Sequence, residues 1–137
     1  MQEYNFERMK RDLKMQQTEN IIRLSEKDNI RDLQFAFSQL YPYLRIEFYK
    51  EDRTSPRGSY KKYLSGSLPL SAAGLSKGGD VLINDAMTVD ELENELKKNF
   101  GLVMQALRKA GNVWLEINIS ANWTLGRQNQ QGRELSD

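Results

Sequence analysis

Residues 88–116, with the sequence TVDELENELKKNFGLVMQALRKAGNVWLE, contain the clearest structural pattern in the chain. Thr88 and Glu91 have the spacing of a capping box, in which each side chain accepts a hydrogen bond from the other residue's backbone N–H. Gly101 supplies the left-handed stop that commonly follows a helix. The segment therefore predicts a helix that ends at about Gly101. Its buried face is expected to consist of Val89, Leu92, Leu96 and Phe100.

Two strands joined by a tight turn are expected after this helix, over residues 103–109 and 113–119. A further strand is expected over residues 44–50, where apolar and polar residues alternate. Alternation assigns successive side chains to opposite faces of a sheet. On the register we infer, one face packs on the helices and the other stays open. The open face is expected to carry Tyr49, Met104, Ala106 and Trp114, bordered by Arg45, Glu47, Arg108 and Glu116.

The same order of strand and helix occurs earlier in the chain. Residues 21–24 predict a short strand, and the following helix ends before Pro42, which disfavours helical backbone in the residue before it. Residues 81–83 predict another short strand. The apolar positions of the first helix recur at amphipathic spacing, at Ile30, Leu33, Phe37 and Leu40.

This order of elements predicts an α+β fold. We expect a ferredoxin-like, split βαβ sheet of four or five strands with two helices on one face. Residues 1–20 are expected to form an N-terminal helical extension, which either frays or docks on the sheet or on a second chain. Residues 21–123 form the α+β domain, with an arm or long loop at 51–79 that contains short strands near 60–64 and 67–70. Residues 124–137 are expected to be a disordered polar tail.

The composition limits the chemistry that is available. The chain of 137 residues is the size of one domain, and its formal net charge is +1. It contains no cysteine and no histidine, which excludes disulfides, thiolate metal sites and histidine-dependent catalytic triads. No apolar run reaches the length of a membrane span, and the start lacks the apolar region of a signal peptide. A cytoplasmic protein is the expectation.

No motif predicts a catalytic, cofactor or metal site. The glycines do not form a phosphate-binding loop, and the acidic residues of segment 80–98 lack the spacing of a calcium loop. Glu47 and Glu116 are a candidate carboxylate pair, but Arg45 and Arg108 on the same expected face explain them as ion-pair partners. We therefore expect a protein without enzymatic activity and without a cofactor.

Two functions agree with these observations. The first is a protein-interaction domain that self-associates, as a homodimer, through the open sheet face. Its expected interface residues are Tyr49, Met104, Trp114, Arg45, Arg108 and Glu116. The alternative is a nucleic-acid-binding accessory protein that uses the basic, tyrosine-containing segment 45–63, although the sequence pI of 7.9 is low for that class. Its expected contacts are Arg53, Arg57, Tyr60, Lys61, Lys62 and Tyr63.

The segment from Thr88 to Glu116 also resembles an uncharacterised bacterial domain family. The resemblance covers about a fifth of the chain and includes no catalytic motif. Because that family has no assigned activity, the resemblance implies no functional residues.

Overall fold

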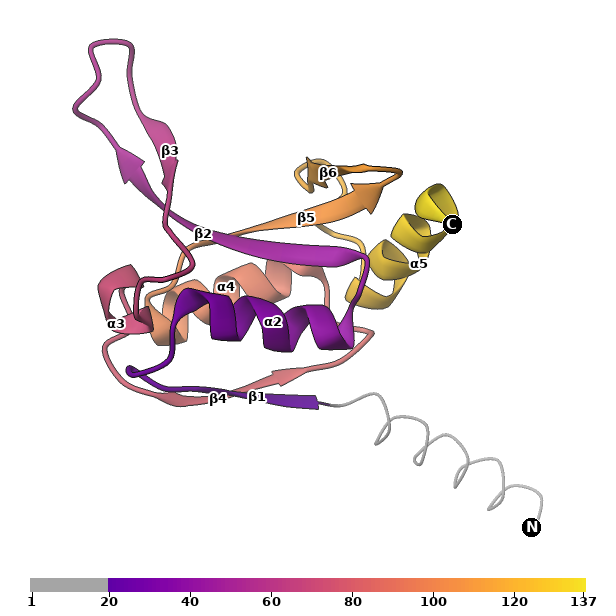
Figure 1. Ribbon diagram of the computed structural model, residues 1–137, viewed down its shortest axis with the longest axis horizontal. Helices are drawn as coiled ribbons and strands as arrows, with labels where there is room; N and C mark the ends of the chain where they lie inside the picture. The colour runs from indigo at the N-terminus through magenta and orange to yellow at the C-terminus, as the bar shows by residue number, and fades with distance from the viewer. Residues whose placement is uncertain (1–19) are drawn as a thin grey trace, which may run out of the picture.

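The computed structural model describes residues 20–137 (Figure 1). The N-terminal helix expected at residues 1–20 therefore lies outside the described residues, except that Asn20 begins the first strand. In chain order the elements are β1 (Asn20–Leu24), α2 (Ile30–Leu40), β2 (Leu44–Asp52), β3 (Tyr60–Tyr63), α3 (Leu70–Ala73), β4 (Gly79–Ile83), α4 (Val89–Phe100), β5 (Met104–Ala110), β6 (Val113–Glu116) and α5 (Leu125–Ser136).

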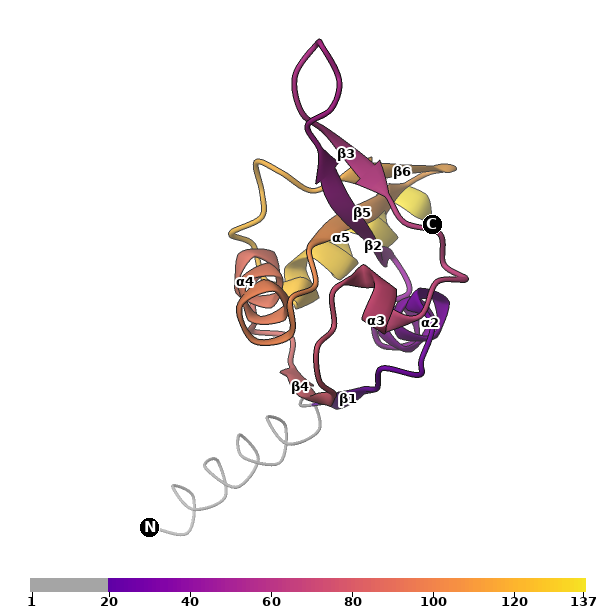
Figure 2. The ribbon, with the colours of Figure 1, turned by 90° about the vertical axis from the view of Figure 1, so that its left-hand side faces the viewer.

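The strands are divided between two antiparallel sheets, with helices α2 and α4 between them (Figures 1 and 2). One sheet has four strands in the order β3-β2-β5-β6, and the other pairs β1 with β4. The α+β class is confirmed, as is the placement of helices on one face of the four-stranded sheet. A ferredoxin-like arrangement is not confirmed, because β1 and β4 pair with each other across the helices from the other strands.

Apolar side chains fill both sides of the helical layer. The alternate residues of β1 and β4 that face the helices are buried, as are Leu44, Ile46 and Phe48 of β2. Helix α4 begins with the predicted capping box, since Glu91 donates its N–H to Thr88 Oγ1 at 3.1 Å and Thr88 donates to Glu91 Oε1 at 3.2 Å. The predicted helical stripes are buried at Ile30, Leu33, Phe37, Val89, Leu92, Leu96 and Phe100.

The chain consists of two halves with the same order of elements. The first runs β1-α2-β2-β3-α3 and the second β4-α4-β5-β6-α5. Ile30 N–H donates to the Leu68 carbonyl at 2.9 Å, and the equivalent bond joins Val89 to Trp123 at 3.2 Å. The halves therefore repeat their backbone contacts as well as their order. Further equivalent donor–acceptor pairs are Leu70 to Asp28 and Leu125 to Met87, and Leu64 to Phe48 and Ile117 to Ala106.

Strand pairing relates the two halves by an approximate two-fold axis. In the two-stranded sheet, Ile22 lies opposite Val81, its equivalent in the second half. In the four-stranded sheet, Glu47 lies opposite its equivalent, Gln105. The chain thus contains within itself the symmetrical contact that two separate copies of one half would make.

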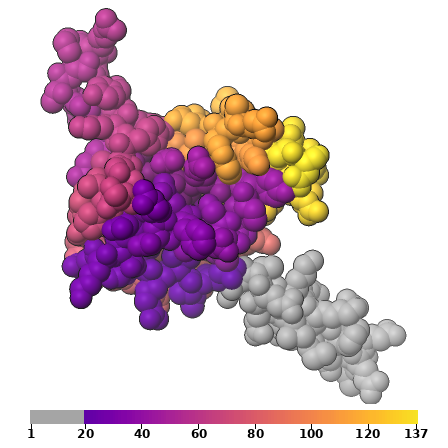
Figure 3. Space-filling view, viewed as in Figure 1, coloured from indigo at the N-terminus to yellow at the C-terminus, as the bar shows by residue number. Residues whose placement is uncertain are grey.

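The halves differ most after their shared elements. Helix α3 has four residues, whereas α5 has twelve. The β2–β3 connection is also longer than the β5–β6 turn, so that residues 49–63, here called the hairpin arm, project from the body of the protein (Figures 1 and 3). The strand expected near residues 67–70 is not present, because this segment is the turn that leads into α3.

Helix α5 corrects the expectation of a disordered tail at residues 124–137. Thr124 caps it by accepting the Arg127 N–H at 3.1 Å, and Leu125 and Gln128 are buried. Gly132 packs so closely on Tyr43 that a Cβ at position 132 would lie 2.8 Å from Tyr43 Cβ. Leu125 is the one apolar residue among the three buried residues of the helix, the others being Gln128 and Gly132, so apolar periodicity does not detect the helix.

The glycine that ends α4 makes a second close backbone contact, with Gly74 at the end of α3, and a substitution can test it. Gly101 has φ +71°, and a Cβ there would lie 2.7 Å from the Gly74 carbonyl oxygen. Gly111 has φ +64° with nothing within 4 Å of a Cβ. We expect Gly111→Ala to lower the free energy of unfolding by about 1–2 kcal/mol, the cost of left-handed backbone. Gly101→Ala should cost about 1–3 kcal/mol more, because the carbonyl must also move. Urea unfolding measures both, and equal losses would contradict the close contact.

Candidate functional site

The candidate site is the outer face, defined as the side of the four-stranded sheet that points away from α2 and α4. No helix of residues 20–137 lies over this face (Figures 1 and 2). The strand register places residues from all four strands on it. They are Lys61 and Tyr63 from β3; Arg45, Glu47, Tyr49 and Glu51 from β2; Gln105, Leu107 and Lys109 from β5; and Trp114 and Glu116 from β6.

Four of the six predicted interface residues lie on the outer face, and two do not. Tyr49, Trp114, Arg45 and Glu116 are placed there as expected. The two exceptions, like Ala106, are on the opposite side of β5. They are Met104 and Arg108.

Met104 and Arg108 were assigned to the wrong side of the sheet for a reason that lies in the β5 sequence. Met104 is buried beneath the sheet, and Arg108 Nη1 donates to Gln128 Oε1 of α5 at 2.8 Å. Apolar residues occur at both parities of this strand, so alternation alone did not determine which side faces the helices. Gln105 was the available signal, since it is the polar residue of the otherwise apolar stretch 102–107.

An aromatic ring with a cation stacked on it forms one end of the outer face. The Arg45 guanidinium carbon lies 4.5 Å from the centroid of the Trp114 ring, and Trp114 is partly buried. Leu107, opposite Arg45 in the register, is also partly buried. Stacking of this kind contributes roughly 0.5–1 kcal/mol at an exposed site. This end of the face therefore combines apolar surface with a positive charge.

A polar network crosses the middle of the outer face. Lys61 of β3 donates to Gln105 Oε1, and its Nζ lies 3.9 Å from Glu116 Oε2 of β6. Tyr63 of β3 also donates to Glu116. Side chains of the two edge strands thus meet across the two central strands.

Gln105, a residue that sequence reasoning missed, anchors this network. It is only 4% exposed, and its amide Nε2 donates to the carbonyl oxygens of Ala106 at 2.9 Å and Ile117 at 3.1 Å. Its remaining oxygen accepts from Lys61. Because a buried amide is costly unless it is hydrogen-bonded, Gln105 holds the Lys61 ammonium in place over the sheet.

Several ionisable groups around this network have shifted pKa values. The hydrogen bond from Tyr63 is the main cause that lowers the pKa of Glu116, and burial followed by the same bond raises the pKa of Tyr63. Burial, with a smaller contribution from Asp90, raises the pKa of Glu93 on α4 to about 6, while Lys61 opposes the shift. Glu93 is therefore a partly buried acid beside the outer face that titrates near neutral pH.

The residues predicted to contact nucleic acid lie on the hairpin arm but do not form one surface. Lys61 and Tyr63 face outward on the sheet, whereas Tyr60 and Lys62 lie on the opposite side of the arm. At the tip, Arg53 pairs with Glu51 at 3.0 Å. The remaining predicted residue of the tip is Arg57, which is exposed.

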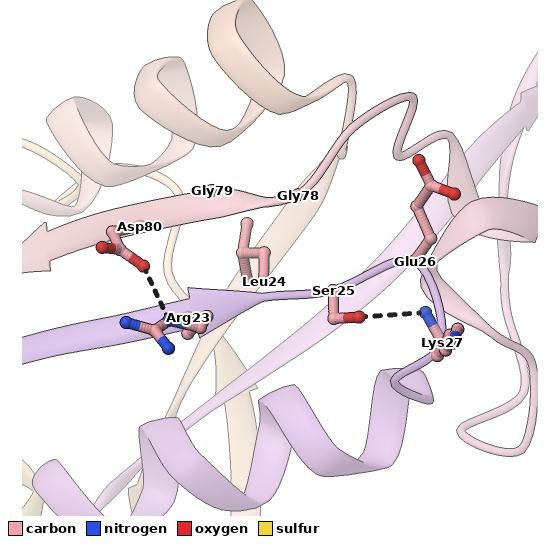
Figure 4. Close-up of a pocket in the computed structure, with 8 residues that line it drawn as sticks. All are labelled: Arg23, Leu24, Ser25, Glu26, Lys27, Gly78, Gly79 and Asp80. Atoms are coloured by element: carbon pink, nitrogen blue, oxygen red, sulfur yellow. Dashed lines mark hydrogen bonds and ion pairs between the residues drawn. The ribbon is translucent and has the colours of Figure 1, made fainter.

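A surface hollow of about 390 Å³ lies where β1 and β4 meet (Figure 4). The Arg23 and Asp80 side chains on its rim pair with each other, Nε to Oδ1, at 3.3 Å, and both are exposed. A Cβ on Gly78 would lie 2.5 Å from the Leu24 carbonyl oxygen, so this glycine serves close backbone packing. Mutual neutralisation and strand packing explain the hollow without a ligand.

Several acidic residues of segment 80–98 each make a separate contact within the fold. Asp85 accepts from the Tyr41 hydroxyl at 2.9 Å, while Asp80 and Glu91 serve the ion pair and the helix cap described above. Within residues 20–137 no group of three or more acidic side chains is arranged to hold a metal ion. In the same part of the chain, no helix has the length and apolar character needed to cross a membrane.

Comparison with known proteins found no match to this chain among protein-family models, curated proteins or solved structures. The family resemblance of residues 88–116 is therefore unsupported.

The raised pKa of Glu93 predicts a pH-dependent stability. The folded protein binds this proton more tightly than the unfolded chain does. The contribution of Glu93 to the free energy of unfolding is therefore complete below pH 4.5 and is lost as the pH rises through about 6. We expect Glu93→Gln to stabilise the protein at pH 8 by about 1 kcal/mol, allowing for partial exposure, and to have little effect at pH 4.

Chemical unfolding at pH 4, 6 and 8 measures this effect. Glu26→Gln is the matched control, since it removes the same charge from an exposed turn outside the site. A Glu93→Gln variant with the wild-type change in stability between pH 4 and pH 8 would contradict the assignment.

Proposed function

We propose that the protein is a non-enzymatic interaction domain that binds a second copy of itself through the outer face. The observation that carries this proposal is the partly buried apolar surface of Trp114, Tyr49 and Leu107, over which no helix of residues 20–137 lies. Arg45 stacks on the Trp114 ring and Lys61 lies over the Tyr49 ring. Aromatic and arginine side chains are enriched at protein interfaces, where a few large side chains contribute most of the binding energy.

The distribution of charge on the outer face favours a two-fold arrangement of copies. Arg45 and Lys109 lie at the Trp114 end, and neither forms an ion pair within residues 20–137. Glu51 lies at the other end, where it pairs with Arg53, and burial, followed by the charge of the partly buried Glu93 of α4, raises the pKa of Tyr49 there. A copy related by a two-fold axis that lies in the interface, parallel to the sheet and perpendicular to the line joining the two ends, would stack the outer faces with each positive end against the other end, which orients the contact.

The carboxylates on this face support a binding role over acid–base catalysis. Glu47 accepts a hydrogen bond from Gln34 Nε2 at 3.2 Å, and Glu116 accepts from Tyr63 and lies near Lys61. Each carboxylate is thus engaged by neighbours within the fold. In the proposed dimer these bonds hold the rim in a fixed geometry.

A substitution at the Trp114 end of the outer face tests self-association. Trp114→Arg should convert a dimer of twice 15.9 kDa to a monomer, because it removes the largest apolar side chain and places a second cation beside Arg45. Val113→Arg is the matched control: it lies on the same strand, is 54% exposed and faces the other way, opposite Ala110. Light scattering coupled to size-exclusion chromatography gives the masses.

The control variant should retain the dimeric mass of the wild-type protein. A wild-type protein that remains monomeric at high concentration, or a loss of mass in both variants, would refute self-association through this face.

A further inference from the structure

The hairpin arm contains a like-charge pair that does not stabilise the fold. Lys50 of β2 and Lys62 of β3 are directly opposite each other in the register, and both are exposed. They lie on the side of the arm that faces away from Tyr49 and Lys61. Like charges at directly opposed positions destabilise a strand pair, so the arm has this arrangement at a cost to its own stability.

In the second half, the cation at the position equivalent to Lys50 is covered by a helix and hydrogen-bonded. Arg108 is the equivalent of Lys50, and it lies opposite Leu115, the equivalent of Lys62. There α5 covers the strand, and Gln128 accepts a hydrogen bond from Arg108 at 2.8 Å. In the first half α3 ends after four residues, so no helix covers the two lysines.

The neighbouring charges on the arm have close partners, whereas three cations form no ion pair. Arg53 pairs with Glu51 at 3.0 Å, and Lys61 binds Gln105. Asp52 shares a side with the lysines, but it accepts hydrogen bonds from Thr54 and Tyr60. The bonds from Thr54 are the main cause that lowers the pKa of Asp52, and the Lys62 charge reaches that carboxyl only as a minor cause. The three cations of the arm that form no ion pair within residues 20–137 are Lys50, Arg57 and Lys62.

We propose that the hairpin arm binds the phosphate backbone of a nucleic-acid duplex through Lys50, Arg57 and Lys62. Their positive charge is complementary to phosphate. A two-stranded ribbon fits the major groove of a duplex, which is about 12 Å wide. The arm stands clear of the body, as such insertion requires (Figures 2 and 3).

The composition of this side of the arm favours nucleic acid over an acidic protein segment. Protein interfaces depend on buried apolar anchors, and this side offers only the ring of Tyr60, whose hydroxyl is bonded to Asp52. Phosphate binding needs no such anchor, because release of counterions drives it. The proposal does not depend on self-association, since it uses the tip of the arm and the side of it opposite the outer face.

Fluorescence anisotropy with a labelled duplex of about 20 base pairs tests the proposal at salt concentrations from about 25 mM upward. Three phosphate contacts predict a slope of about −2.7 for the logarithm of the binding constant against that of salt concentration. Lys50→Gln with Lys62→Gln should reduce the slope to about −0.9. Lys97→Gln with Lys98→Gln is the matched control, because it removes the same charge from exposed residues of α4 and should leave the slope unchanged.

Thermal melting separates lost binding from lost structure. The Lys50→Gln, Lys62→Gln variant should melt at the wild-type temperature or higher, since it removes a repulsive pair. The same duplex should bind the Trp114→Arg variant normally, which distinguishes this site from the outer face.

Three results would overturn the proposal. They are no binding to the duplex at the lowest salt concentration, equal losses in the two double variants, and tighter binding to the matched single strand or to polyglutamate than to the duplex. The polyglutamate result would assign the lysines to an acidic protein partner.

Discussion

The antiparallel pairing of β2 with β5 determines the architecture of this protein. It joins the two halves at Glu47 and Gln105, opposes equivalent strands and places α2 and α4 beneath one sheet. The pairing of Ile22 with Val81 repeats the two-fold relation between the halves in the two-stranded sheet, on the other side of the helices. Because the two halves already pair their strands with each other, the surfaces left for partners are the outer face of the four-stranded sheet and the projecting hairpin arm.

Both of these surfaces arise where the two halves differ. The second half extends its last helix to twelve residues and covers the underside of β5, where Arg108 is bonded to Gln128. The first half ends α3 early and lengthens its hairpin instead, which exposes Lys50 and Lys62. Lys61, on the other side of the same hairpin, reaches back to the outer face. The arm therefore contributes to two surfaces of opposite orientation.

Local signals in the sequence predicted the elements that local physics determines. The capping box of α4 was sufficient to predict a helix, and the apolar alternation of residues 44–48 was sufficient to predict a strand. Alternation of apolar and polar residues also placed Trp114 on the correct side of the sheet. Pairing of β1 with β4 is a long-range choice that five-residue strands do not encode locally. The register of β5 was misread because apolar residues occur at both parities, and α5 was missed because Gln128 and Gly132 provide its buried contacts.

The central claim is that the outer face joins two copies of the chain. Because the sequence contains no cysteine, Asn112→Cys in the exposed turn between β5 and β6 would provide a single site for a nitroxide beside the Trp114 end of that face. Pulsed electron spin resonance on the labelled protein should detect dipolar coupling between copies, and dilution with excess unlabelled protein should remove it. Absence of coupling at concentrations well above those used for light scattering would contradict the account.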